Sequence, residues 1–111
     1  MIYEYILLDE EKMLKENPTV VANDKYAEIL KIAEQYNMKK SEPFYETEKG
    51  LWIKSDDSDN EFVNAGIFFM VLTDNKWLLK YITHWYAIHN FDDEDEFVTE
   101  NVLDSIRKYS K

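Results

Sequence analysis

The sequence contains no cysteine and only two glycines and two prolines in 111 residues. Without cysteine there is neither a disulfide framework nor a thiolate metal site, so we expect a reducing, cytoplasmic location. Two glycines cannot build a phosphate-binding loop or a dinucleotide-binding turn, and no serine lies in a nucleophile elbow. These absences exclude nucleotide-dependent and α/β-hydrolase chemistry, and the chain has no low-complexity linker.

Positive charge is also scarce, since 13 basic residues stand against 23 acidic ones and the formal net charge is −10. Nucleic-acid affinity comes largely from Lys and Arg that displace counterions from phosphates, so we expect no direct binding to DNA or RNA. The opening MIYEYILLDE has no basic n-region, and no apolar run approaches the ~20 residues that span a bilayer. We expect neither an export signal nor a membrane helix.

Length and apolar content favour one folded domain. Leu, Ile, Val and Phe together make up 30 of the 111 residues. This share exceeds the roughly 20% below which a highly charged chain stays disordered. A chain of this length holds one core and has no room for a second. We predict a single domain over residues 1–111.

Two patterns in the first half of the chain are regular. Residues 2–8, IYEYILL, combine β-branched, aromatic and aliphatic side chains and predict a strand, followed by a short helix in DEEKMLKEN. In residues 23–37 apolar side chains recur every three or four positions. That spacing predicts an amphipathic helix.

The second half is richer in β-branched and aromatic residues. We interpret residues 44–57, 61–75 and 76–90 as three strands joined in two consecutive hairpins. In the third segment the apolar spacing also fits a helical face, so a helix stays open as the alternative to the preferred strand. The whole pattern predicts an α+β fold: an antiparallel sheet of about four strands packed with two main amphipathic helices, residues 23–37 and 93–110.

Five consecutive carboxylates, Asp92, Asp93, Glu94, Asp95 and Glu96, occur where this last helix is expected to begin. Asp93 and Glu96 have the spacing of a capping box, and one or two acids are stabilised by the positive end of a helix dipole. Five acids in a row repel one another. The run is therefore either a solvated tip or a site that binds a partner.

Candidate catalytic residues are few. His84 and His89 are the only histidines, and on a strand their spacing of five places them on opposite faces, so they cannot share a metal ion. Residues 56–62, DDSDNEF, alternate acids as a calcium loop does but lack its glycine and its final ligand, so a hairpin turn is preferred. The sequence predicts no catalytic residue, no cofactor and no metal site.

Aromatic rings and acidic patches remain as candidate binding features. Three Trp, eight Tyr and six Phe make 15% of the chain, more large rings than one small core hides easily. Residues 41–75 carry 2 Lys against 8 acidic residues. We predict two acidic partner-binding patches, one made of Glu46, Glu48, Asp56, Asp57, Asp59 and Glu61, and one of Asp92, Asp93, Glu94, Asp95 and Glu96.

These features favour an interaction protein. The preferred hypothesis is a small cytoplasmic inhibitor that binds a basic protein surface, such as that of a nucleic-acid enzyme, by imitating a row of phosphates. Phage counter-defence and immunity proteins are of this kind. The first alternative is an enzyme or small-ligand binder with an aromatic pocket closed by the sheet and a helix, in which His84 or His89 is acid or base. The second is a homo-oligomeric structural subunit that assembles through a sheet edge or an aromatic patch.

Overall fold

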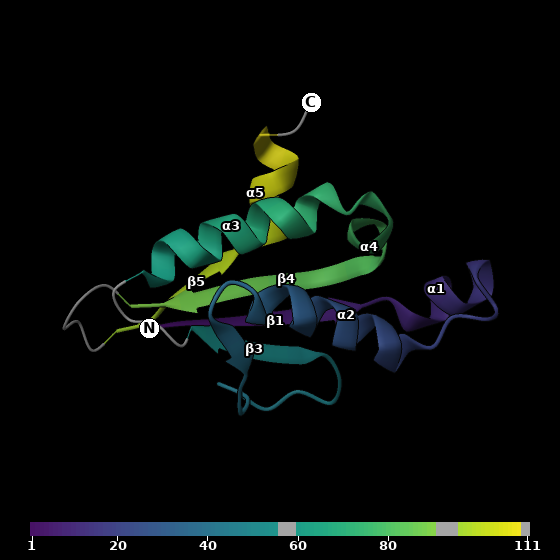
Figure 1. Cartoon of the computed structure of the whole chain (residues 1–111), viewed down its shortest axis with the longest axis horizontal. Helices are drawn as coiled ribbons and strands as arrows, with labels where there is room; N and C mark the ends of the chain where they lie inside the picture. Colours follow the sequence, from purple (N-terminus) through teal and green to yellow (C-terminus); the bar gives the residue numbers. More distant parts are fainter. Residues whose placement is uncertain (56–59, 91–95, 110–111) are drawn as a thin grey trace.

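The computed structural model describes residues 1–55, 60–90 and 96–109 (Figure 1). Within these residues the chain forms five strands and five helices, in the order β1 (Ile2–Leu8), α1 (Glu10–Glu16), α2 (Ala22–Glu34), β2 (Met38–Lys40), β3 (Leu51–Ser55), α3 (Glu61–Asp74), α4 (Lys76–Tyr81), β4 (Ile82–His89), β5 (Val98–Asn101) and α5 (Val102–Tyr109). The described strands form one antiparallel sheet in the order β2-β3-β1-β4-β5. The predicted α+β fold with about four strands is confirmed.

The main core lies between one face of the sheet and the helices. Ile6 of β1 and Trp85 of β4 are register neighbours on this face, and both are fully buried. They belong to one cluster with Ile29 of α2, Phe68 of α3 and Leu78 of α4. Figure 1 shows α3 running alongside β4. Packing against the sheet therefore fixes the position of α3.

The opposite face of the sheet carries a smaller cluster made of Tyr5, Trp52 and Ile88. The loop between β2 and β3 folds over this face, where the Tyr45 ring packs edge-on against Trp52 at 4.8 Å between ring centroids. Trp52 Nε1 donates a hydrogen bond to Thr47 Oγ1 at 2.9 Å. In the described part of the chain, this face is thus covered by a loop, whereas the helices gather on the other face.

The predictions for β1, α1 and α2 are confirmed. Helix α1 begins after Asp9, whose side chain accepts a hydrogen bond from the backbone N–H of Lys12 at 3.1 Å and so caps the first turn. The predicted helix ended at residue 37, whereas α2 ends three residues earlier, at Glu34. Asn37 then takes a left-handed conformation, with φ of 59°, which ends the helical path.

The prediction of a strand over residues 61–75 is wrong, because residues 61–74 form α3. The buried side chains Glu61, Phe68 and Leu72 fall on one face of this helix and point to the sheet side. An apolar run of this length exceeds a typical strand and suits a helix. Since α3 and α4 separate β3 from β4, the two predicted hairpins do not form.

Two neighbouring predictions are correct only in part. Residues 76–90 contain both of the weighed alternatives, since α4 ends at Tyr81 and β4 begins at Ile82. Within the predicted strand 44–57, the described strand covers only Leu51–Ser55. A hairpin turn was predicted at residues 56–62. Residues 61 and 62 belong to α3 instead, and residues 56–59 lie outside the described residues.

The prediction of one helix over residues 93–110 is wrong in its first half. Val98–Asn101 form the edge strand β5, paired with β4, and α5 begins only at Val102. β-Branched residues such as Val98 favour the pleated surface of a sheet over a helix. Glu96 lies before this strand and in no helix, and Asp93 lies outside the described residues. The capping-box spacing therefore does not mark the start of α5.

Gly50 and Gly66 are expected to respond in opposite directions to substitution by alanine. Gly50 has φ of 105°, and a Cβ there would lie 2.8 Å from Cζ of the Tyr5 ring, so Gly50→Ala should lower the free energy of unfolding by about 1–3 kcal/mol. A Cβ at Gly66 meets nothing within 4 Å, so Gly66→Ala should raise it by about 0.5–1 kcal/mol through helix propensity. Urea denaturation measures both; equal effects would contradict this reading.

Candidate functional site

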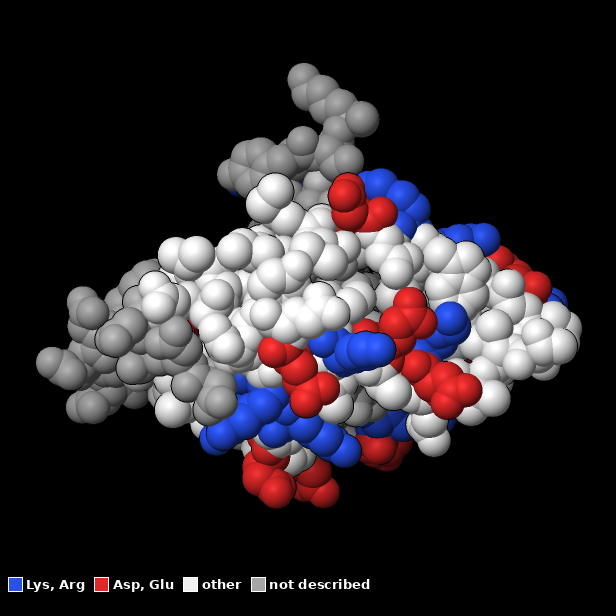
Figure 2. Space-filling model, viewed as in Figure 1, with Lys and Arg blue, Asp and Glu red and all other residues white. Residues whose placement is uncertain are grey.

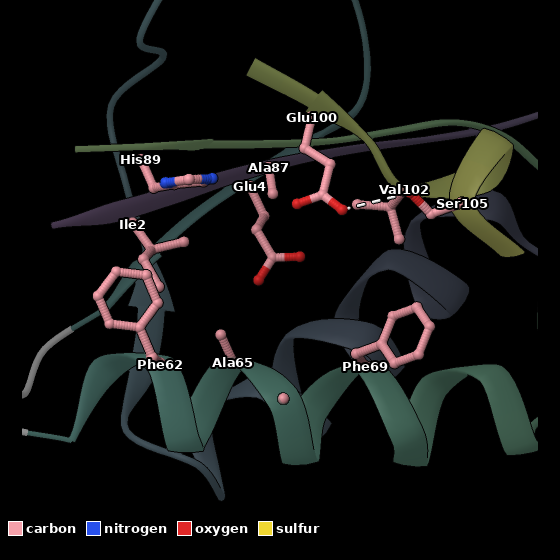
Figure 3. Close-up of a pocket in the computed structure, with 11 residues that line it drawn as sticks. Ile2, Glu4, Phe62, Ala65, Phe69, Ala87, His89, Glu100, Val102 and Ser105 are labelled. Carbon is pink, nitrogen blue, oxygen red and sulfur yellow. Dashed lines mark hydrogen bonds between the residues drawn. The ribbon is translucent and has the colours of Figure 1, made fainter. Parts of the chain in front are cut away.

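A pocket with a volume of about 460 Å³ lies between α3 and the sheet (Figure 3). This volume falls within the roughly 300–1,000 Å³ of pockets that bind small organic groups. Phe62, Ala65 and Phe69 line it from α3, and Figure 3 shows the side chain of Glu4 pointing from the sheet toward this helix, between the two phenylalanines. The lining also includes Val102 from α5. The pocket is therefore apolar on its α3 wall and carries a carboxyl group on its sheet side.

The strand register explains how two carboxylates reach the same pocket. Glu4 of β1 pairs with Ala87 of β4, and Ala87 pairs with Glu100 of β5, so the three residues form one row across the sheet. Neighbouring strands lie about 4.8 Å apart, which places the backbones of Glu4 and Glu100 about 10 Å apart. The small side chain of Ala87 between them leaves room above the sheet. His89, two residues further on, lines the same pocket.

Glu4 is the most unusual group in the pocket, because only 4% of its surface is exposed. Its Oε1 accepts a hydrogen bond of 2.6 Å from Nε1 of the buried Trp85. Burial raises the pKa of Glu4 to about 7; the Trp85 hydrogen bond opposes this shift, and the charge of Glu100 adds to it. Near neutral pH the carboxyl group is therefore present in both its neutral and its ionised form.

Glu100 and His89 complete the polar side of the pocket. Glu100 is exposed, and its Oε1 accepts a hydrogen bond of 3.3 Å from the hydroxyl of Ser105 in the first turns of α5. The His89 ring meets the Phe62 ring edge-on, at 6.1 Å between centroids. One acid of the pair is thus buried beneath the pocket, and the other stands at its solvent side.

Helix α3 exposes large apolar side chains outside its buried face: Val63 and Met70 point away from the sheet, whereas Phe62 and Phe69 flank the pocket. We refer to five of them, Phe62, Val63, Ile67, Phe69 and Met70, as the α3 face. Val63 is 62% exposed and Met70 is 67% exposed. A helix that is apolar all round is normally buried, and an exposed apolar patch usually marks a binding surface. The α3 face adjoins the pocket, because Phe62 and Phe69 belong to both.

The surface around the α3 face carries no charged side chain from α3 between its two ends. The sequence has no Lys, Arg, Asp or Glu between Glu61 and Asp74. In Figure 2 the surface over α3 is made of uncharged residues, whereas acidic and basic side chains gather over α2. The uncharged α3 face therefore contrasts with the strongly charged surface beside it.

None of the acidic residues predicted as partner-binding and described in the structure lines the pocket. Glu46 and Glu48 are exposed in the loop that covers the opposite face of the sheet, and Glu96 is exposed just before β5. The remaining predicted members of the two patches, Asp56, Asp57, Asp59, Asp92, Asp93, Glu94 and Asp95, lie outside the described residues. The described residues do not bring Glu46 or Glu48 together with the pocket, since these acids lie on the other side of the sheet.

Glu61, also predicted as an exposed acid, has a buried side chain. Its Oε1 lies 2.8 Å from the amino group of Met1, and its Oε2 accepts a hydrogen bond of 2.9 Å from Ser55 Oγ. Glu61 opens α3, where a carboxylate also interacts favourably with the positive end of the helix dipole. Its contacts fasten the start of α3 to β1 and β3, so it is no part of an exposed patch.

The two histidines lie on opposite faces of β4, as their spacing predicts. His84 stacks on Tyr86 at 5.8 Å between ring centroids, on the face that the β2–β3 loop covers. His89 lines the pocket beneath α3. The alternative drawn from the sequence, a pocket closed by the sheet and a helix, named His84 or His89 without choosing between them; only His89 lines this pocket, and Glu4 and Glu100 were missed. The alternation of Glu4 with Tyr3 and Tyr5 was the available signal, because it places an acid on the face opposite two aromatic rings.

No protein-family model matches the chain, and a search of curated proteins found no match. Among the described residues, no three His, Asp or Glu side chains are grouped so that they would hold a metal ion. No helix in the described part of the chain combines the length and the apolar character required to cross a membrane.

Replacing Glu4 by Gln should change stability in a pH-dependent way. The folded-state pKa of about 7 lies above the ordinary value of 4.5, so the unfolded chain ionises first and the wild type loses stability as pH rises between these values. Gln keeps an oxygen for Trp85 and does not ionise. The stability of Glu4→Gln relative to the wild type should therefore grow by about 2 kcal/mol from pH 5 to pH 8. Urea denaturation at several pH values tests this, and a constant difference would contradict it.

Proposed function

We propose that this protein is an interaction module that binds a partner protein through the α3 face. The observation that carries the proposal is the exposure of five large apolar side chains on one helix that has no charged residue between its ends. Exposed Phe and Met side chains provide large contact areas, and clusters of such residues supply most of the energy at protein interfaces. The helix is held firmly by its inner side chains, so the face is presented in a fixed shape.

A basic partner suits the charge of the chain better than a second copy of it. The net charge of −10 attracts a basic protein over a long range and speeds the encounter. Two copies would carry the same charge and repel each other, although the α3 face itself is uncharged. We therefore assign the face to a different protein with an apolar surface and basic residues around it.

This proposal keeps part of the function expected from the sequence. A basic partner and aromatic anchoring are common to both, but the anchors now lie on α3 and not in the acidic runs. That the module acts in the cytoplasm as an inhibitor, and that it belongs to phage counter-defence or immunity, stay predictions. So does the role of the acidic patches in partner binding.

Polar substitutions on α3 should weaken partner capture without unfolding the protein. Val63 and Met70 are exposed, and Gln has a length close to that of Met and a good helix propensity. The double variant Val63→Gln, Met70→Gln should lower partner affinity at least about tenfold. The measurement is quantitative affinity capture from the cells that produce the protein, at matched bait concentration.

A matched control lies on α1, where Leu14 is also an exposed apolar residue but is remote from α3. Leu14→Gln should retain the basic proteins that the double variant loses. Equal retention by the two variants would rule out the α3 face as the interface. If the wild type sediments as a dimer and the double variant as a monomer, the α3 face serves self-association and not a different partner protein.

A further inference from the structure

We propose that the pocket beneath the α3 face binds a primary ammonium group on an aliphatic stem, namely the side chain of a lysine in the partner. The inference rests on the proposed function, because it gives the chemistry of one contact that the partner makes beside α3.

The shape suits a long chain with a polar end. Phe62, Ala65 and Phe69 form an apolar wall on α3, and the volume is about 460 Å³. In Figure 3 the two acids approach this space from the sheet, Glu4 from β1 and Glu100 from β5. A lysine side chain buries its methylene stem along apolar surface and places its charge at the tip. The stem would lie along the phenylalanines and the tip would reach the carboxylates.

The pocket has an excess of negative charge. It is lined by two carboxylates, and none of its described lining residues is Lys or Arg. Within the described part of the chain, Glu4 forms a single side-chain hydrogen bond, the one from Trp85, and neither acid forms an ion pair. A buried carboxylate without a counter-ion is costly, and an anionic ligand would make that cost larger. A cation that enters the pocket removes it.

An ammonium group has the donors that these acceptors require. It carries three N–H donors in a compact charge, whereas a guanidinium is a planar fork suited to both oxygens of one carboxylate. In this pocket the acceptors belong to separate strands, on either side of Ala87. Three diverging donors would allow one ammonium group to bond to both Glu4 and Glu100. Charge-assisted hydrogen bonds of this kind are about twice as strong as neutral ones.

The proposal predicts a pH dependence. The titratable groups that face the site are Glu4 from β1, His89 from β4 and Glu100 from β5, while α3 and α5 contribute none to the lining. Burial raises the pKa of Glu4 to about 7, so a bound cation should favour its ionised form and lower that pKa. Binding should therefore strengthen as pH rises through 7. The Glu4→Gln variant tests whether Glu4 causes this dependence.

The test uses the full-length protein and n-hexylammonium as the probe, with 1-hexanol as its neutral counterpart. Two-dimensional NMR of the amide groups at pH 8 should show shifts on α3, β4 and β5, and about tenfold tighter binding of the ammonium compound. Glu4→Gln should remove this preference. Glu96→Gln removes the same charge from an exposed carboxylate outside the pocket lining and should leave the preference unchanged.

Three outcomes would overturn the assignment. Equal affinity for hexylammonium and hexanol would show an apolar pocket without selection for a cation. Tighter binding of n-butylguanidinium than of hexylammonium would replace lysine by arginine. A preference that Glu96→Gln lowers as much as Glu4→Gln does would trace the effect to overall charge and contradict the site.

A pocket-filling variant separates this inference from the proposed function. Gly66 lines the pocket, and a Cβ added there meets nothing within 4 Å, so we expect Gly66→Leu to fold and to weaken binding of the probe. It should also weaken capture of the partner, as the lysine is then excluded. If Val63→Gln, Met70→Gln abolishes partner capture and Gly66→Leu leaves it intact, the α3 interface is supported and the lysine contact is rejected. If Glu4→Gln abolishes probe binding but Val63→Gln, Met70→Gln loses no captured partner, the ammonium site is supported and the protein interface is rejected.

Discussion

The hydrogen bond between Trp85 and Glu4 connects the core of this protein to its pocket. Trp85 is fully buried beneath α3, where its ring lies 6.1 Å from that of Phe68. A buried indole N–H requires an acceptor, and Glu4 on the neighbouring strand provides it at 2.6 Å. The acid is thereby drawn under the helix, where burial raises its pKa to about 7. The same contact that satisfies the core leaves a carboxyl group facing the pocket.

Helix α3 has two apolar sides with different roles. Phe68 and Leu72 pack on the sheet, whereas Val63 and Met70 point outward. The apolar residues on the outer side stay in contact with water. They therefore bury little surface and add little to the stability of the isolated chain. Their presence on the helix that roofs the pocket links the two candidate binding features. We infer that one partner contacts both.

The sequence was sufficient for the elements with a clear period and insufficient for α3. The stripe in residues 23–37 predicts α2 correctly, because one side of that helix is charged. Residues 61–74 are apolar all round, so the helical period is hidden and their β-branched and aromatic content suggests a strand. Val98–Asn101 was mistaken for helix because the pairing of β5 with β4 is a long-range contact. Glu4 and Glu100 were missed for the same reason, since only that register places both acids beside Ala87.

The pKa of the Glu4 side chain, measured by following its ¹³Cδ resonance during a pH titration, tests this account most directly. The wild type should titrate near 7, and the value should fall when hexylammonium is added. Assignment is secured by the loss of the resonance in Glu4→Gln. A titration near the ordinary 4.5, unchanged by the amine, would show that the carboxyl group is solvated and that the pocket holds no buried acid.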